Sequence, residues 1–343
     1  MRQSFKPFVL SCFLAGIVVF AGTTSTHAQN ANYRLTKTIS IAGDEGWDYV
    51  AVDSNLRRVY VSHGSHVVVL DADSDKVVGD IPDTQGVHGI AIAPDLNRGF
   101  TSNGRADTVT IFDLHTLKVF GTVKAGTNPD AIVYDPATKR VFTMNGRSQD
   151  TTAIEAATGT VAGTLALGGK PEFSVADGKG TIYVNIEDKS ELVQFDTKKL
   201  AVLHRWPMAP CKEPSGLAAD WKSHRLFAGC DNKIMAIIDA RSGKVVTTVP
   251  IGDGVDANAF DSETNLAFAS TGDGHLTVAH EDSADKYTVL SNLATKTSAR
   301  TMGLDLKTHK IFLPAADFDP AAPGERRGKM KTGSFVLLVA SPN

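Results

Sequence analysis

Short runs of alternating hydrophobic and polar residues fill most of the chain. They include residues 89–93 (GIAIA), 131–134 (AIVY) and 216–220 (GLAAD). Alternation with a period of two is typical of β-strands, and the Asp, Asn, Gly and Ser residues between the runs are typical of turns. No long segment repeats its hydrophobic residues with the helical period, so we predict an all-β fold.

The alternating runs belong to a unit that is repeated seven times. Each unit has an inner strand, a polar turn, a second strand that ends at an aromatic residue, and a third and fourth strand. The aromatic residues recur every 40 to 44 positions, at Tyr60, Phe100, Phe142, Tyr183, Phe227, Phe268 and Phe312. A period of this length with strand-like content indicates propeller blades rather than helical repeats. We therefore predict a seven-bladed β-propeller with four antiparallel strands per blade.

The two ends of the repeat array complement each other. The seventh unit begins near Ser298 and stops at its third strand, residues 335–341, while residues 33–43 form an additional strand before the first unit. If the N-terminal strand completes the last blade, the ring closes without a free edge. The length of 343 residues suggests two domains, but the repeats predict a single domain over residues 29–343.

Residues 1–28 have the features of a secretory signal peptide. Arg2 and Lys6 precede an apolar run at residues 8–20, and small residues at Thr26 and Ala28 mark a cleavage site before Gln29. A lipoprotein would use Cys12, but that residue lies near the start of the apolar run. No run reaches the roughly 18 apolar residues of a membrane span. We expect a periplasmic or secreted protein without a membrane span.

Export determines how the remaining cysteines are interpreted. After cleavage the chain keeps only Cys211 and Cys230. Two cysteines in an oxidising compartment favour a disulfide, and the segment between them offers only His224 and acidic residues as further zinc ligands. We predict a Cys211–Cys230 disulfide.

The composition is that of an ordinary globular protein. Hydrophobic residues make up 42% of the chain, charged residues make up 21%, and the formal net charge is −3. These values exclude a disordered chain, a collagen and a coiled coil. The net charge provides no general reason for binding to nucleic acid or to an anionic membrane.

The second strands carry a resemblance to a known family. They read YVSH (60–63), FTSN (100–103), FTMN (142–145) and YVNI (183–186), and residues 108–123 read TVTIFDLHTLKVFGTV. With these motifs the chain resembles the YVTN-repeat (YncE-like) β-propellers over residues 33–341, although the last three units read FAGC, FAST and FLPA. The G-H…W-D signature of WD40 blades is absent. The resemblance implies an exported propeller, and it makes DNA one candidate partner.

Seven polar residues occupy one equivalent position just before the buried part of each inner strand. The alignment of the units places there Asp48, His88, Asp130, Glu172, Ser215, Asp256 and Arg300. We expect this set to surround the channel mouth, with Asp48, His88, Asp130, Glu172, Asp256 and Arg300 as ligand-binding residues. A shift of one residue in the register would turn every one of these side chains away.

Three interpretations of this set stay open. It is a hydrated channel mouth, or a site for a ligand or a hard divalent cation such as calcium, or a set of crowded carboxylates for acid–base chemistry. His63 and His88 are the candidate metal ligands. The sequence contains no nucleophile elbow, no H-E-x-x-H and no phosphate-binding loop. We favour a monomeric binding or interaction scaffold for a small molecule or protein, with a lactonase-like or metal-assisted hydrolase as the alternative.

The seventh unit carries an insertion at residues 314–334. Four basic residues lie within six positions there, namely Arg326, Arg327, Lys329 and Lys331. This segment is either a solvated loop or a contact loop for an anionic partner such as a DNA backbone. Phe318 is its only aromatic residue, so sequence-specific base recognition is not supported.

Overall fold

The computed structural model describes residues 1–5, 32–322, 324 and 328–343. Met1–Phe5 form no helix or strand, and the rest of the predicted signal peptide lies outside the described residues. Ala31–Asn343 form one compact unit. In the described ranges, no helix is long and apolar enough to cross a membrane.

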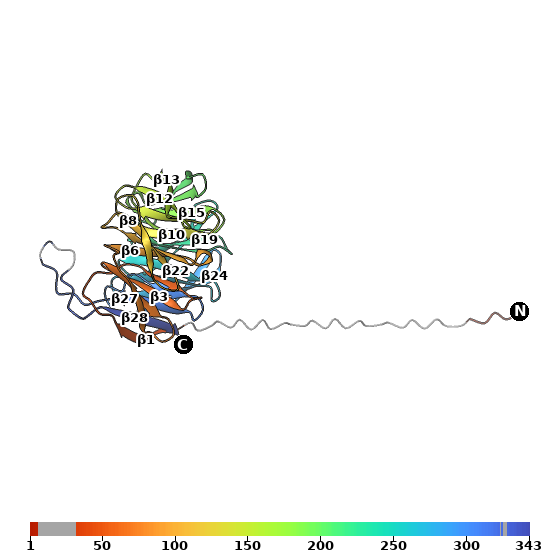
Figure 1. The fold of residues 1–343 in the computed structure, drawn as a ribbon. Helices are drawn as coiled ribbons and strands as arrows, with labels where there is room; N and C mark the ends of the chain where they lie inside the picture. The colour runs from red at the N-terminus through yellow and green to blue at the C-terminus, as the bar shows by residue number, and fades with distance from the viewer. Residues whose placement is uncertain (6–31, 323, 325–327) are drawn as a thin grey trace. The chain divides into compact units, whose positions relative to one another are not determined.

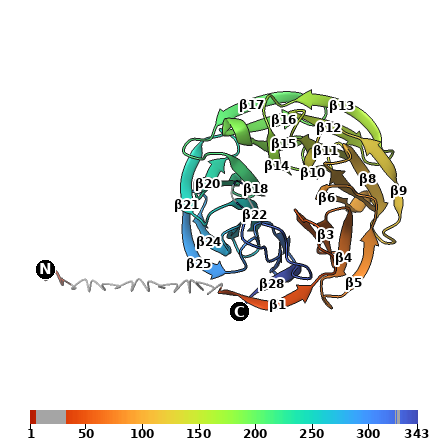
Figure 2. The same cartoon turned by 90° about the vertical axis from the view of Figure 1, so that its left-hand side faces the viewer.

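The compact unit is a seven-bladed β-propeller, with four antiparallel strands in each blade (Figures 1 and 2). The strands of the first three blades are β2 (Val50–Asp53), β3 (Arg58–His63), β4 (His66–Asp71), β5 (Val77–Ile81); β6 (Val87–Ala93), β7 (Arg98–Asn103), β8 (Thr108–Asp113), β9 (Val119–Lys124); and β10 (Pro129–Asp135), β11 (Arg140–Asn145), β12 (Asp150–Glu155), β13 (Thr160–Ala166). In each blade the first strand lies nearest the axis and the fourth lies at the circumference (Figure 2).

The next three blades repeat this order. Their strands are β14 (Pro171–Ala176), β15 (Thr181–Ile186), β16 (Glu191–Asp196), β17 (Ala201–Pro207); β18 (Pro214–Asp220), β19 (Arg225–Cys230), β20 (Ile234–Asp239), β21 (Val245–Pro250); and β22 (Val255–Asp261), β23 (Leu266–Thr271), β24 (His275–Ser283), β25 (Lys286–Ala294). Two short 3₁₀ helices, η1 (Pro94–Leu96) and η2 (Glu187–Lys189), occupy connections.

The N-terminal strand completes the seventh blade, as the sequence predicts. This blade consists of β26 (Gly303–Asp305), β27 (Lys310–Ala315), β28 (Val336–Pro342) and β1 (Tyr33–Ser40). β1 and β28 pair antiparallel from Tyr33 opposite Pro342 to Ser40 opposite Val336. The pairing gives β28 a neighbour on its outer side and leaves β1 at the circumference, where the outer strands of the other blades lie.

Burial explains why the pattern of hydrophobic residues differs between the second strand and the outer strand of a blade. The second strands are buried on both faces because each blade packs between two others; β3, β7 and β11 each have five buried residues out of six. Outer strands are mostly exposed or half-buried, and in β25 the two classes alternate along the whole strand. The repeated aromatic residue is the third residue of each second strand. The prediction that these strands end at the aromatic was therefore wrong, because the three residues after it continue the ladder.

The predicted disulfide is present. Cys211 precedes β18 and Cys230 is the last residue of β19, with a Cα–Cα distance of 5.4 Å. Both side chains are buried in the hydrophobic core between the fourth and fifth blades. The bridge connects the start of the inner strand to the end of the second strand at one face of the propeller.

Closure of the ring yields the first testable prediction. Tyr33 in β1 is buried, its ring packs edge-on against Phe268 of the sixth blade at 5.2 Å, and its hydroxyl donates to the His309 carbonyl. We expect Tyr33→Ala to lower the free energy of unfolding by about 3–5 kcal/mol, as for other large buried aromatic side chains. Arg34→Ala, at the exposed neighbouring position, should change it by less than about 0.5 kcal/mol. Equal denaturant midpoints for the two variants would contradict a stabilising role of β1.

Candidate functional site

The seven aligned polar residues surround one cavity at the channel mouth. We call this cavity of about 240 Å³ the inner chamber. Its wall includes Asp48, His88, Asp130, Glu172, Ser215, Asp256 and Arg300. Five of them are the second residue of an inner strand, while Asp48 and Arg300 lie in the loops before β2 and β26. The structure thus brings together one residue from each of the seven blades.

Hydrogen bonds between blades hold the backbone of this set. In four places a side chain from the preceding blade donates to the main-chain carbonyl of a chamber residue. The pairs are Thr301 to Asp48, Ser102 to Asp130, Asn185 to Ser215 and Ser270 to Arg300. These bonds position the chamber residues relative to the neighbouring blades, which makes the site preformed.

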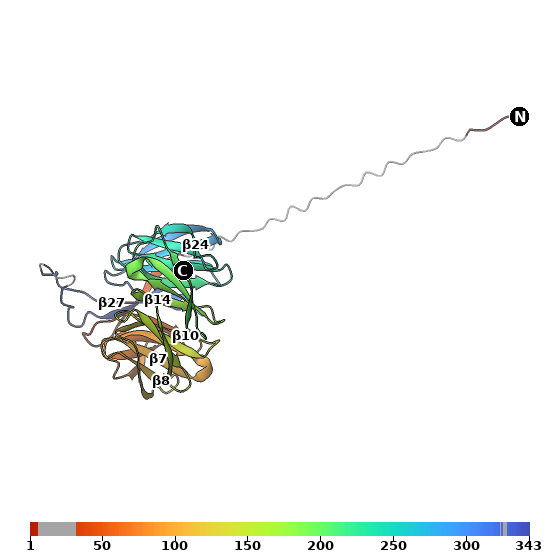
Figure 3. The same cartoon turned by 90° about the horizontal axis from the view of Figure 1, so that it is seen from above.

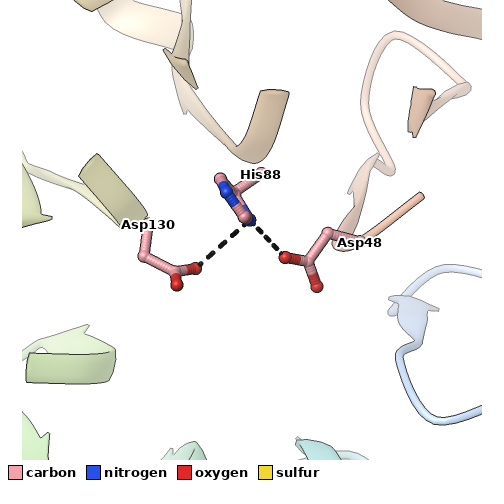
Figure 4. Close-up of side chains that lie close together, drawn as sticks. All are labelled: Asp48, His88 and Asp130. Carbon is pink, nitrogen blue, oxygen red and sulfur yellow. Dashed lines mark hydrogen bonds and ion pairs between the residues drawn. The ribbon is translucent and has the colours of Figure 1, made fainter. Parts of the chain in front are cut away.

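His88 lies between two aspartates (Figure 4). Its Nδ1 is 2.5 Å from Asp48 Oδ2 and 3.7 Å from Asp130 Oδ1. Burial lowers the pKa of His88, but the hydrogen bond with Asp48 and the charge of Asp130 outweigh burial and raise the pKa to about 9. His88 is therefore an imidazolium at neutral pH. A Cβ at Gly104 would lie 2.7 Å from His88 Nε2, so glycine leaves room for this ring.

Asp130 and Glu172 are the two carboxyl groups whose protonation the chamber changes most clearly. Burial raises the pKa of Asp130 to about 6, with the charge of His88 opposing the rise. Burial and the repulsion by Asp130 raise the pKa of Glu172 to about 9, although Lys170 Nζ lies 2.6 Å from Glu172 Oε1. Within the described part of the chain, Asp130 Oδ1 is buried and accepts no hydrogen bond. This oxygen is thus an unsatisfied acceptor, while the Asp130 side chain as a whole is partly exposed and lines the chamber.

The opposite side of the chamber holds a second charged pair. Arg300 Nε lies 3.0 Å from Asp256 Oδ2, and the Ser215 hydroxyl donates to Asp256 Oδ1 at 2.8 Å. Burial raises the pKa of Asp256, against the opposing effect of Arg300. The guanidinium thus neutralises this carboxylate in place.

Tyr49 forms the floor of the chamber. It comes from the first blade but packs edge-on against Phe173 of the fourth blade, with ring centroids 5.2 Å apart. The first and fourth blades are not neighbours in the ring (Figure 2), so this side chain crosses the channel axis. Burial and the surrounding carboxylates raise the pKa of Tyr49, and its hydroxyl stays protonated.

A second cavity of about 460 Å³ adjoins the chamber, and we call it the vestibule. The vestibule and the inner chamber share Asp48, His88 and Arg300 in their walls. Loops that follow second strands line the vestibule and carry the exposed side chains of Arg105 and Arg147. The two cavities are therefore adjacent.

The alignment of the repeats missed several residues of these cavities. Lys170 and Glu187 line the chamber, and Arg105, Arg147 and Trp47 line the vestibule. A usable signal existed for Glu187, Arg105 and Arg147, because each lies one or two residues after a second strand and those loops share a face with the chamber residues. Arg105 and Arg147 occupy equivalent positions, each in an Asn-Gly-Arg sequence at the end of a second strand. The comparison missed them because it aligned only the starts of the inner strands.

The other candidate residues that the structure describes line neither the chamber nor the vestibule. His63 is fully buried, its ring stacks on Phe335 at 4.5 Å, and it lines neither cavity, so it does not join His88 as a metal ligand. Burial lowers the pKa of His63 to about 4. The chain after β27 extends away from the blades (Figure 3). Lys329 and Lys331, between β27 and β28, are exposed, whereas Arg326 and Arg327 lie outside the described residues.

Comparisons with known proteins establish the fold and no more. No family model and no curated protein matches the sequence. A chain of the mitotic checkpoint complex aligns with a TM-score of 0.74 and 16% identity over 99% of both chains. A chain of hydrazine synthase from Kuenenia stuttgartiensis aligns with a TM-score of 0.68 and 14% identity, over 80% of this chain and 94% of that chain.

The raised pKa of Glu172 predicts a pH-dependent stability. This carboxyl group titrates near 4.5 when unperturbed and near 9 in the folded protein. Its contribution to stability is complete below pH 4.5 and is lost progressively as the pH rises towards 9. The variant Glu172→Gln lacks this titrating group. Between pH 5 and pH 9 its free energy of unfolding should therefore decrease by at least about 1 kcal/mol less than that of the parent, since one pKa unit corresponds to about 1.4 kcal/mol.

The measurement is urea unfolding of both proteins at a series of pH values. Glu213→Gln, at an exposed position outside the chamber, should keep the pH profile of the parent. Parallel profiles for the parent and Glu172→Gln would show that Glu172 titrates normally in the folded protein.

Proposed function

We propose that this protein is an exported propeller of the YVTN-repeat type that binds a small ligand through a cationic group in the inner chamber. The observation that carries the proposal is the excess of carboxyl groups in one preformed cavity. Five carboxyl groups line the chamber, at Asp48, Asp130, Glu172, Glu187 and Asp256, against three cationic side chains, at His88, Lys170 and Arg300. Glu172 keeps its proton at neutral pH, so four carboxylates face three cations and leave an excess of one negative charge. A cationic group would neutralise this excess.

Asp130 is the expected centre of recognition. The other charged groups of the chamber have close partners, since Asp48 binds His88, Lys170 binds Glu172 and Glu187, and Asp256 binds Arg300. Asp130 has only the more distant His88 and a buried oxygen without a hydrogen-bond donor. Leaving a buried acceptor unpaired costs about 1–3 kcal/mol, which an ammonium group in the chamber would recover.

Export is supported by two independent features. The N-terminal sequence combines basic residues, an apolar run and a small-residue cleavage site before Gln29. The Cys211–Cys230 disulfide is of the kind that persists in oxidising compartments. The second strands that read YVSH, FTSN, FTMN and YVNI support the YVTN-repeat type.

Titration with n-hexylamine tests the binding function. Calorimetry on the chain from residue 29 should give saturable binding, and Asp130→Asn should weaken it at least tenfold while keeping the shape of the side chain. Asp231→Asn, an exposed position that follows β19 on the same face, should leave the affinity unchanged. Absence of binding to the parent, or equal affinities in both variants, would refute the chamber as a cation site.

A second candidate is a metal-assisted hydrolase. Its basis is that one ligand atom each of Asp48, His88 and Asp130 lie within 4.8 Å of one another. Carboxylate oxygens and an imidazole nitrogen suit a divalent cation, which would supply a Lewis acid for polarising a carbonyl group of the substrate. His88 would have to release the proton of Nδ1, the atom that Asp48 now contacts.

Elemental analysis distinguishes this candidate. A metal centre predicts close to one equivalent of a divalent metal in natively purified protein, and loss of that metal in His88→Gln. His204→Gln, at an exposed position on an outer strand, should retain it. Metal-free protein that also fails to take up Ca²⁺ or Zn²⁺ in calorimetry would remove the hydrolase candidate.

A further inference from the structure

The vestibule has the opposite charge balance to the chamber that it adjoins. Four cationic side chains line it, at His88, Arg105, Arg147 and Arg300, against two carboxylates, at Asp48 and Asp107. Asp107 already accepts the backbone N–H of Asn128 at 2.8 Å. A ligand that enters therefore passes a positively charged opening before it reaches the carboxyl groups.

Arg105 and Arg147 are the unpaired charges of the vestibule. Both are exposed, and no ion pair involves either of them within the described ranges. They follow β7 and β11, the second strands of two adjacent blades. Two guanidinium groups that project into one cavity are suited to a carboxylate, which each can bind with paired N–H donors.

The same two blades supply Asp130 and its neighbour His88 in the adjoining chamber. The second blade contributes His88 and Arg105, and the third contributes Asp130 and Arg147. The carboxylate of Asp130 and the guanidinium groups of Arg105 and Arg147 therefore line adjoining cavities on the same two blades. The cavities measure about 240 and 460 Å³, which is room for a small organic molecule that reaches from one into the other.

We propose that the ligand is a short zwitterion whose ammonium group binds Asp130 in the chamber and whose carboxylate binds Arg105 and Arg147 in the vestibule. This inference rests on the proposed function and specifies the class of ligand that the chamber binds. The two ends sit in different cavities, so several bonds must separate them. That excludes a free α-amino acid and selects ω-amino carboxylic acids and short peptides with free ends.

The vestibule also provides a surface for the middle of such a ligand. Trp47 lines it, and this ring is fixed by packing against Phe335 and Phe318, with centroid distances of 5.1 and 5.9 Å. Gly46, Gly64, Gly86 and Gly104 also line the vestibule. A rigid indole and a wall without side chains leave space for methylene groups or a peptide backbone.

Calorimetric titration with four probes tests the proposal. The probes are 6-aminohexanoate and triglycine, which carry both charges, and n-hexylamine and hexanoate, which carry one each. At least one zwitterion should bind ten or more times tighter than n-hexylamine, and hexanoate should bind weakest. Tighter binding of triglycine identifies a peptide ligand, and tighter binding of 6-aminohexanoate identifies an ω-amino acid.

Variants assign the two ends of the ligand. The double variant Arg105→Gln/Arg147→Gln should reduce the affinity for the zwitterions to that for n-hexylamine and leave n-hexylamine itself unchanged. Asp130→Asn should weaken zwitterions and n-hexylamine alike. Arg241→Gln, an exposed position that follows β20, should alter neither, and thermal unfolding checks that each variant is folded.

Two outcomes separate failure of this inference from failure of the proposed function. If n-hexylamine binds as tightly as both zwitterions, or if the double arginine variant has no effect, the zwitterion is wrong and the cation site stands. If none of the four probes binds the parent, both proposals fail.

Discussion

The antiparallel pairing of β1 with β28 is the constraint on which the rest of the molecule depends. It joins the first strand of the compact unit to the last and gives the seventh blade its fourth strand. Because the ring is closed, every blade packs between two others, and their second strands can be hydrophobic on both faces. The chamber needs the same closure, since its wall takes one residue from each blade. A gap between the first and last blades would separate Asp48 from Arg300 and open the cavity.

Enclosing so many charged groups is unfavourable unless each has a partner. The chamber meets this requirement with three arrangements, namely the Asp48–His88 pair, Lys170 between Glu172 and Glu187, and Arg300 with Asp256. The raised pKa of Glu172 reduces the charge further, because its carboxyl group keeps a proton at neutral pH. Asp130 is the exception, and such exceptions in a rigid protein mark positions where stability is given up for binding.

The sequence predicted the architecture and the seven aligned polar positions because both repeat with the blade. Equivalent residues of repeated blades meet around one axis, so aligning His88 with Asp130 or Glu172 was enough to define a shared position. Features that differ between blades could not be found this way. Lys170 is such a feature, because no other blade has a basic residue at its position. Arg105 and Arg147 do recur, two residues after β7 and β11, but they lie outside the strand positions that were aligned. His63 was misplaced because its side chain turns towards Phe335, a packing choice that strand order does not reveal.

Tyr49 affects the route by which a ligand can reach the chamber. Its ring crosses the axis and contacts Phe173, so aromatic side chains from two blades that are not neighbours meet in the channel beside the chamber. This contact narrows the channel there, whereas the vestibule adjoins the chamber with a larger volume. A molecule that binds in the chamber and reaches into the vestibule would occupy that approach and block the arrival of a second molecule.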